Sequence, residues 1–230
     1  MQTNPTSGVI KEAWELYKQQ YSHLIPVAAV VYVGIAILSA ILVGLLGWFG
    51  ALVAAALSII GVFWVQGALT RAVQDIRDGR ADLSVGETFK SVQDKIGPIA
   101  GASILAGLGI AIGLLLLIVP GLFLITIWSL IVPTIVLENV GALDSFGRSR
   151  AIVRGNEWNV FGVVVLTFLI LVGFSLVLAL ILSPLNAAVQ NFLSNVISGT
   201  LTAPFLALTW TLVYYRLVGD RAAEPPPPAV

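Results

Sequence analysis

The residues best suited to chemistry lie in one polar segment, residues 138–158, between two long apolar stretches. Its arginines carry rigid forks of N–H donors that match phosphate and carboxylate oxygens. Such a segment could bind anionic lipid headgroups. Its three acids, Glu138, Asp144 and Glu157, equal its three arginines in number, so an ion-paired clamp within the protein is an equal alternative. The candidate lipid or partner interface is Glu138, Arg148, Arg150, Arg154, Asn156 and Trp158.

Few residues elsewhere in the sequence could act in catalysis. The chain has no cysteine, which excludes disulfides and thiol chemistry. Its one histidine, His23, stands at the start of the first apolar stretch, whereas an intramembrane Ser–His dyad needs a histidine deep in a span. No cluster of histidines and carboxylates has metal-site spacing, and the apolar stretches hold no ionisable relay for protons. We predict a non-enzymatic protein without cofactors or metals.

Three charge-free stretches must position the polar segment, and they cover residues 19–70, 96–137 and 158–215. A hydrocarbon core of about 30 Å takes roughly 20 helical residues to cross. Each stretch is too long for one crossing and too short for three, so each should cross twice. We predict an all-α membrane protein with six transmembrane helices in three helical hairpins. The predicted spans are residues 24–46, 51–70, 98–118, 121–137, 159–182 and 192–214.

A short amphipathic helix at the membrane interface should precede each hairpin. Three segments repeat the order of an acid, a small residue and an aromatic residue, although any loop that leads into a membrane helix favours a charge and an aromatic anchor. The repeated order has two possible explanations, a structural three-fold repeat or a chance likeness. The three segments are Glu12-Ala13-Trp14, Glu87-Thr88-Phe89 and Asp144-Ser145-Phe146.

The hairpin at residues 96–137 has an alternative form. Its second span is short and contains Pro133, so the hairpin could be partly re-entrant instead of crossing fully. The chain as a whole should form a single membrane domain over residues 1–221. Residues 222–230 contain four consecutive prolines and should form a disordered tail.

The basic residues predict the orientation. All twelve Lys and Arg residues lie outside the three charge-free stretches, on one side of the membrane if each stretch crosses and returns. The positive-inside rule then places both termini in the cytoplasm. A net charge of zero argues against nucleic acid as a partner. The expected partners are membrane lipids, and a second copy or another membrane protein could also bind.

Small and polar residues within the spans should serve helix packing. Gly97 with Gly101, and Gly109 with Gly113, form two GxxxG pairs that allow close helix approach. Amides gather near the start of the last span, where we expect them to cap helix ends and to bond across helices. A substrate site at broken helices is the alternative for these amides. This polar group is Asn186, Gln190, Asn191, Asn195 and Ser198.

A short motif supports a resemblance over residues 85–175. It consists of Pro120-Gly121, an apolar run to Glu138, then Ala142, Ser145, Arg148-Ser149 and Arg154-Gly155-Asn156-x-Trp158. This pattern resembles bacterial proteins of the glycerophosphoryl diester phosphodiesterase membrane-domain type and the related YciC-type inner-membrane proteins. The resemblance implies a membrane fold and an inner-membrane location. It does not imply hydrolysis, because the catalytic domain of some relatives is a large barrel with acidic metal ligands and histidines, for which a chain of 230 residues has no room.

These observations together predict a scaffold or lipid-interacting membrane module. Its working surface would be residues 138–158 on the cytoplasmic side. The alternative is a small transporter or flippase for lipid-like or apolar substrates, which would not need charged residues in its spans.

Overall fold

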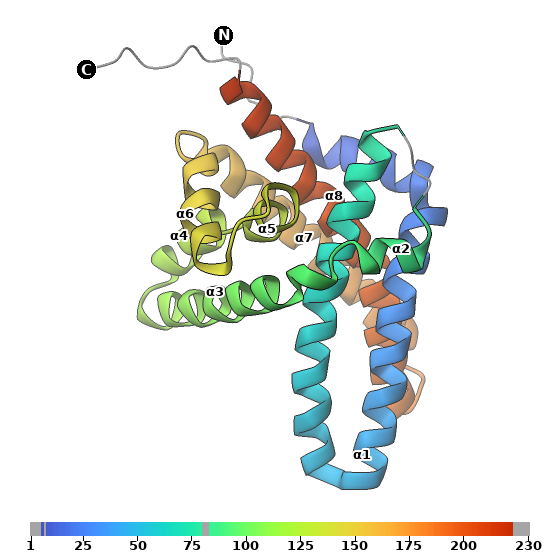
Figure 1. The fold of residues 1–230 in the computed structure, drawn as a ribbon. Coiled ribbons are helices and arrows are strands. Elements are labelled where there is room, and N and C mark those ends of the chain that lie inside the picture. The colour runs from blue at the N-terminus through green and yellow to red at the C-terminus, as the bar shows by residue number, and fades with distance from the viewer. Residues whose placement is uncertain (1–5, 7, 80–82, 223–230) are drawn as a thin grey trace, which may run out of the picture.

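The computed structural model describes residue 6 and residues 8–79 and 83–222, and this part of the chain is helical without any strand (Figure 1). Five of its helices are long and apolar enough to cross a membrane. The chain is therefore an all-helical membrane protein, while the prediction of six spans in three hairpins is not confirmed. The helices are α1 (Val9–Arg77), α2 (Val85–Lys90), a short 3₁₀ helix (Gln93–Lys95), α3 (Ile96–Leu116), α4 (Ile118–Ile127), α5 (Ile131–Glu138), α6 (Ala142–Val153), α7 (Glu157–Leu182) and α8 (Ala187–Ala222).

Helix α1 contains two breaks and is in effect three helical pieces. The backbone leaves helical geometry at Gln20 and again at Gly47, where φ is 56°. Glycine tolerates this left-handed region because it has no Cβ. Figure 1 shows that the chain reverses there, so that residues 21–46 and 48–77 form two adjacent legs. The legs approach closely at Gly61, where an added Cβ would lie 2.6 Å from Cδ1 of Ile35.

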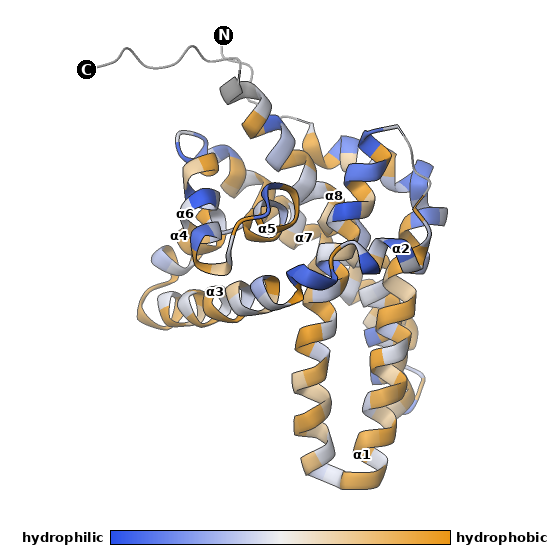
Figure 2. Ribbon diagram, in the orientation of Figure 1, coloured by the Kyte–Doolittle hydropathy of each residue, from blue (hydrophilic) through white to orange (hydrophobic). Residues whose placement is uncertain are grey.

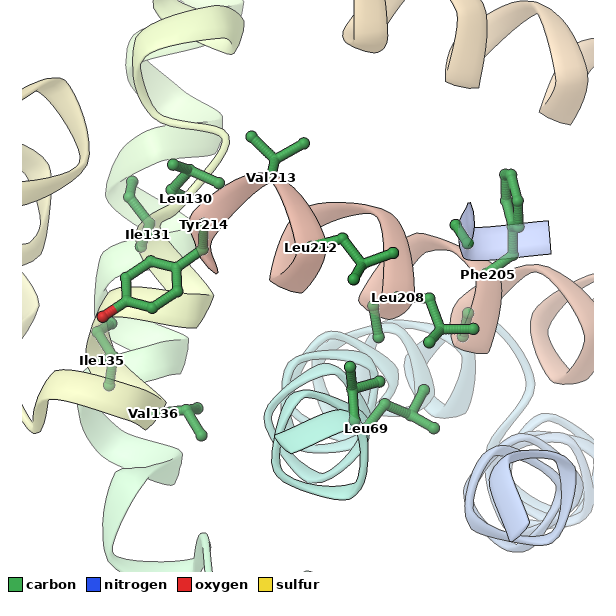
Figure 3. Packing of buried hydrophobic residues seen from close by; sticks show 14 of the residues in the cluster. Leu69, Leu130, Ile131, Ile135, Val136, Phe205, Leu208, Leu212, Val213 and Tyr214 are labelled. Carbon is green, nitrogen blue, oxygen red and sulfur yellow. The ribbon is translucent and has the colours of Figure 1, made fainter. Parts of the chain in front are cut away.

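The packed core lies at the end of the molecule that carries the charged loops, which we call the charged end (Figure 2). Leu69 of α1 meets Leu208 and Leu212 of α8 there (Figure 3). The far half of α1 is different, because its large apolar side chains are exposed and Leu45 and Trp48 at the tip are each 77% exposed. Such a surface is stable against lipid tails rather than water. Packing within the chain thus stabilises the charged end, and lipid must cover the rest.

Helices α3 and α4 form a hairpin that differs in direction from α1. An added Cβ at Gly113 would lie 3.1 Å from Cα of Gly121, so the two backbones nearly touch. Figure 1 shows α3 running across the legs of α1 rather than along them. Val119, at the tip of the α3–α4 hairpin, lines the same cavity as Trp158 at the start of α7. The tip therefore lies beside the charged end of α7.

The predicted span 121–137 is broken in the structure. Helix α4 ends at Ile127, and α5 begins at Ile131 after a turn. Pro133 lies in the first turn of α5, where a missing N–H donor costs little. The apolar sequence continues through this turn, so hydropathy alone gives no sign of it. The break directs α5 into the core, where Ile131 and Ile135 are buried.

The three acid–small–aromatic segments share several structural features. Each is helical, and the central small residue is buried in all three: Ala13 and Ser145 are 0% exposed and Thr88 is 1% exposed. Each aromatic residue packs edge-on against another aromatic ring from elsewhere in the chain. The ring pairs are Trp14 with Phe205, Phe89 with Trp64, and Phe146 with Trp128.

One predicted boundary differs in the last part of the chain. Helix α8 extends to Ala222, beyond the predicted span end at residue 214. The residues that follow Ala222 in the predicted disordered tail lie outside the described residues.

Candidate functional site

The candidate interface is built on α5, α6 and the start of α7. Asn139 ends α5 in the left-handed conformation with φ of 59°, and α6 begins after Gly141. Helix α6 has one buried face and one exposed face. Gly155, with φ of 85°, then turns the chain into α7. The buried face of α6 is Ser145, Ser149, Ile152 and Val153.

Glu138 lies at the centre of a three-residue clamp. Arg148 of α6 donates from Nε to Oε2 of Glu138 at 2.5 Å and from a terminal guanidinium nitrogen to Oε1 at 2.8 Å. Tyr214 of α8 donates its hydroxyl to the same Oε1 at 2.8 Å. Figure 3 shows Tyr214 projecting from α8 toward the α5 residues Ile131 and Ile135. The clamp joins α5, α6 and α8 across 76 residues of sequence.

This clamp engages one of the three arginines that sequence analysis assigned to the interface, Arg148. Both oxygens of Glu138 accept from the fork of Arg148, which is the bidentate geometry that guanidinium favours. These hydrogen bonds raise the pKa of Arg148 against the opposing effect of its partial burial. Arg148 is therefore already engaged within the protein. Of the two alternatives open in the sequence, the structure gives this arginine to the internal clamp.

Ser149, which belongs to the sequence motif, has a structural role that sequence analysis did not assign. Its hydroxyl donates to the carbonyl of Ile127 at 2.7 Å and accepts from the N–H of Leu130 at 3.2 Å. These backbone groups belong to the turn between α4 and α5, and Ser149 is 0% exposed. A break in an apolar helix needs such partners for its backbone groups. The available signal was helical spacing, because Ser149 shares a face with Ser145 and Ile152.

The remaining interface residues lie at the exposed edge of the segment. The side chain of Arg150 is exposed and makes no hydrogen bond or ion pair within the described part of the chain. Arg154 ends α6 and is also exposed. Asn156 precedes α7 and accepts from Asn159 through its side chain at 3.3 Å. Trp158 is 84% exposed and packs edge-on against Phe161. Arg150 and Trp158 are thus open to the surroundings, whereas Glu138 and Arg148 are paired.

A cavity of about 490 Å³ lies between α4 and the start of α7. This size falls in the range of small-molecule sites. Its walls are mainly apolar, and the hydroxyl of Thr126 is already bonded to the carbonyl of Leu122. Glu157 accepts the N–H of Gly155 at 2.9 Å through Oε2. The cavity can therefore take an apolar chain and offers one carboxylate at its rim. Its lining is Val119, Leu122, Phe123, Thr126, Glu157, Trp158 and Phe161.

The two glycine pairs of α3 lie in different surroundings. Gly113 faces Gly121 of α4, and an added Cβ at Gly109 would lie 2.8 Å from the ring of Trp128. Gly101 has a looser contact, at 3.9 Å from Cβ of Ala142, and Gly97 has no neighbour within 4 Å. The Gly109–Gly113 pair thus allows close packing of α3 on the α4 region, and the Gly97–Gly101 pair leaves open space.

Metal ligands do not gather anywhere in residues 8–79 and 83–219: no group of three His, Asp or Glu side chains could hold an ion there. His23 lines a void of about 10 Å³ with Asp75 and Thr88. That volume accommodates a single water at most. The cavity between α4 and α7, by contrast, has room for a larger molecule.

Comparison of the chain with protein-family models, curated proteins and solved structures found no match in any of the three.

Proposed function

We propose that this protein is a non-enzymatic membrane module that binds a phospholipid between α4 and α7. The observation that carries the proposal is the apolar cavity with an exposed Trp158 at its rim. An acyl chain fits apolar walls, and an amphipathic tryptophan favours the level of lipid headgroups. Arg150, which is exposed and unpaired within the described residues, supplies positive charge on the neighbouring helix α6. Residues 138–158 form the working surface beside the bound lipid.

The proposed topology places the charged end in the cytoplasm of a bacterial inner membrane, with both termini on that side. The two legs of α1, together with α7 and α8, cross the membrane. The α3–α4 hairpin enters the inner leaflet and returns without a full crossing. A fully crossing hairpin would separate its tip from the start of α7 by roughly the 30 Å of the hydrocarbon core. Val119 and Trp158 instead line one cavity, which favours the re-entrant form.

The proposed family follows the short motif of residues 120–158. The glycerophosphoryl diester phosphodiesterase membrane-domain type and the YciC-type proteins remain the proposed relatives, on the strength of that motif alone. Scaffolding of a protein partner is compatible with lipid binding, because the lipid and the exposed edge of α6 would form one surface.

Lipid binding to the purified protein tests the proposal. Leu122→Trp adds bulk inside the cavity and should reduce phospholipid binding, as measured by native mass spectrometry with a defined phospholipid added in detergent. Leu169→Trp is the matched control, because Leu169 is 57% exposed on the lipid-facing surface of α7. Equal binding by both variants and the parent protein would contradict the proposal.

The headgroup is tested separately. Arg150→Ala should weaken binding of an anionic phospholipid roughly fivefold, since one arginine near the surface contributes about 1 kcal/mol. Binding of a zwitterionic phospholipid should change less. Lys18→Ala is the control, because Lys18 is exposed and already paired with Glu15 at 3.0 Å.

A further inference from the structure

The start of α8 exposes amide side chains on a surface that is otherwise apolar. Figure 2 shows hydrophilic residues near the turn between α7 and α8. Asn186 caps α8 by accepting from the N–H of Val189 at 3.0 Å, as the sequence analysis expected of this group. Asn191 and Asn195 are exposed. Among the described residues, the amide of Asn195 donates only to the carbonyl of Asn191 in the same helix, at 2.8 Å.

Bonds across helices, which we expected for these amides, do not form within the described residues. The side chain of Asn191 has no hydrogen bond there, and the side-chain oxygen of Asn195 accepts none. An exposed amide is ordinary in water and unfavourable among lipid tails. The depth of these residues in the membrane therefore decides what must cover them.

The depth of these amides in the membrane follows from a close contact between α1 and α8. Gly199 of α8 packs directly on the ring of Tyr32, so that an added Cβ would overlap the ring. Fifteen residues separate Tyr32 from the turn at Gly47, which corresponds to about 22 Å of helix. Asn195 precedes Gly199 by one turn, or about 6 Å, and Asn191 precedes it by about 12 Å. Asn195 then lies about 16 Å from the level of the α1 tip, and Asn191 lies about 10 Å from it. Any tilt of α8 brings both closer to the level of Tyr32.

The tip of α1 itself belongs in the membrane. Leu45 and Trp48 are each 77% exposed and Phe49 is 55% exposed, so water would meet a wholly apolar tip. Tryptophan at such a tip favours the headgroup level. With Trp48 at that level, Asn195 lies near the middle of a hydrocarbon core of about 30 Å. The amides are therefore among lipid tails unless a protein surface covers them.

We propose that the face of α8 that carries Asn191 and Asn195 binds the same face of a second copy of this chain. Asparagine both donates and accepts, so an asparagine pair is self-complementary. A two-fold axis along the membrane normal places each residue opposite its own counterpart at the same depth. Ala187 and Ala188 at the start of α8 are small and exposed, which allows the two helices to approach. This contact lies away from the lipid cavity between α4 and α7.

Cross-linking in native membranes tests the contact. The chain has no cysteine, so Asn195→Cys introduces a single thiol. Mild oxidation should give a disulfide-linked dimer. Phe168→Cys is the control, because Phe168 is 63% exposed near the middle of α7 and should give no dimer. Equal cross-linking of the two variants overturns the proposal. Labelling of Asn195→Cys by a water-soluble maleimide as fully as Trp48→Cys also overturns it, because the amides would then lie in water.

Association in proteoliposomes provides an independent measurement. The pair Asn191→Leu and Asn195→Leu should lower the dimer association constant about thirtyfold, since each of the two interhelical polar contacts contributes on the order of 1 kcal/mol. Energy transfer between labelled copies reports the dimer fraction. Val189→Leu changes a neighbouring side chain outside the proposed contact and should leave it unchanged. Lipid binding by the double variant should stay at the parent level, which separates failure of this contact from failure of the lipid site.

Discussion

Glu138 accepts three hydrogen bonds from two helices, and this concentration makes it the residue most sensitive to change at the candidate interface. Arg148→Ala would leave a carboxylate that is only 18% exposed without its cation. Hydrogen bonds to charged groups contribute about 1.5–3 kcal/mol when buried. Arg148 is 43% exposed, so solvent screening lowers the expected loss to roughly 1–2 kcal/mol. Thermal unfolding in detergent measures it.

Arg150, on the same helix, provides the control for the Arg148→Ala variant. Arg150→Ala should leave the unfolding free energy unchanged within about 0.5 kcal/mol, because surface substitutions rarely exceed that value. Tyr214→Phe removes one hydrogen bond and should cost about 1 kcal/mol. If Arg148→Ala proved as stable as Arg150→Ala, the clamp would contribute nothing to stability.

Ser149 provides a second prediction at the level of single residues. Ser149→Ala would leave the carbonyl of Ile127 and the N–H of Leu130 without their partner inside the core. A buried unpaired group costs about 1–3 kcal/mol. Ser145→Ala is the matched control, since Ser145 is equally buried but bonds only to the carbonyl of Ala142 in its own helix. Equal losses of stability in the two variants would show that the bridge to the α4–α5 turn has no special role.

The α3–α4 hairpin is the element whose arrangement has the largest consequence for topology. With the re-entrant form, position 117 at its tip lies among the tails of the inner leaflet. Leu117→Cys should then react with a water-soluble maleimide from neither side of the membrane. Trp48→Cys at the α1 tip should react from outside. Labelling of position 117 from outside would establish a full crossing and restore six spans.

Among the elements, α1, α7 and α8 could be predicted from the sequence and the α4–α5 turn could not. Charge-free stretches bounded by charged residues give a clear signal of length, and the predicted connection at residues 47–50 contains the turn at Gly47. The break after Ile127 lies within a continuous apolar run. Its stabilising partner, Ser149, lies 22 residues further along the chain, in another helix. The periodicity of residues within one helix cannot predict a hydrogen bond between two helices.

The whole molecule divides into a packed charged end and a far half covered by lipid. Composition showed that the protein belongs in a membrane, because apolar length is a property of each segment alone. The clamp could not be predicted in full, since Tyr214 lies 76 residues from Glu138 and its role depends on the folding of α8 over α5. The segment 138–158 was correctly singled out as polar, but its arginines differ in role for reasons of three-dimensional packing.

This division predicts an unequal response to the same substitution at the two ends. Leu208 is 0% exposed within the core at the charged end, and Leu208→Ala should cost about 2–5 kcal/mol of unfolding free energy. Leu45→Ala at the α1 tip removes contacts with lipid rather than with protein, so its cost should stay below about 0.5 kcal/mol. Denaturant titration in micelles, followed by tryptophan fluorescence, measures both. A large loss for Leu45→Ala would mean that protein, from this chain or a second copy, covers the tip, and the assignment of that surface to lipid would then be wrong.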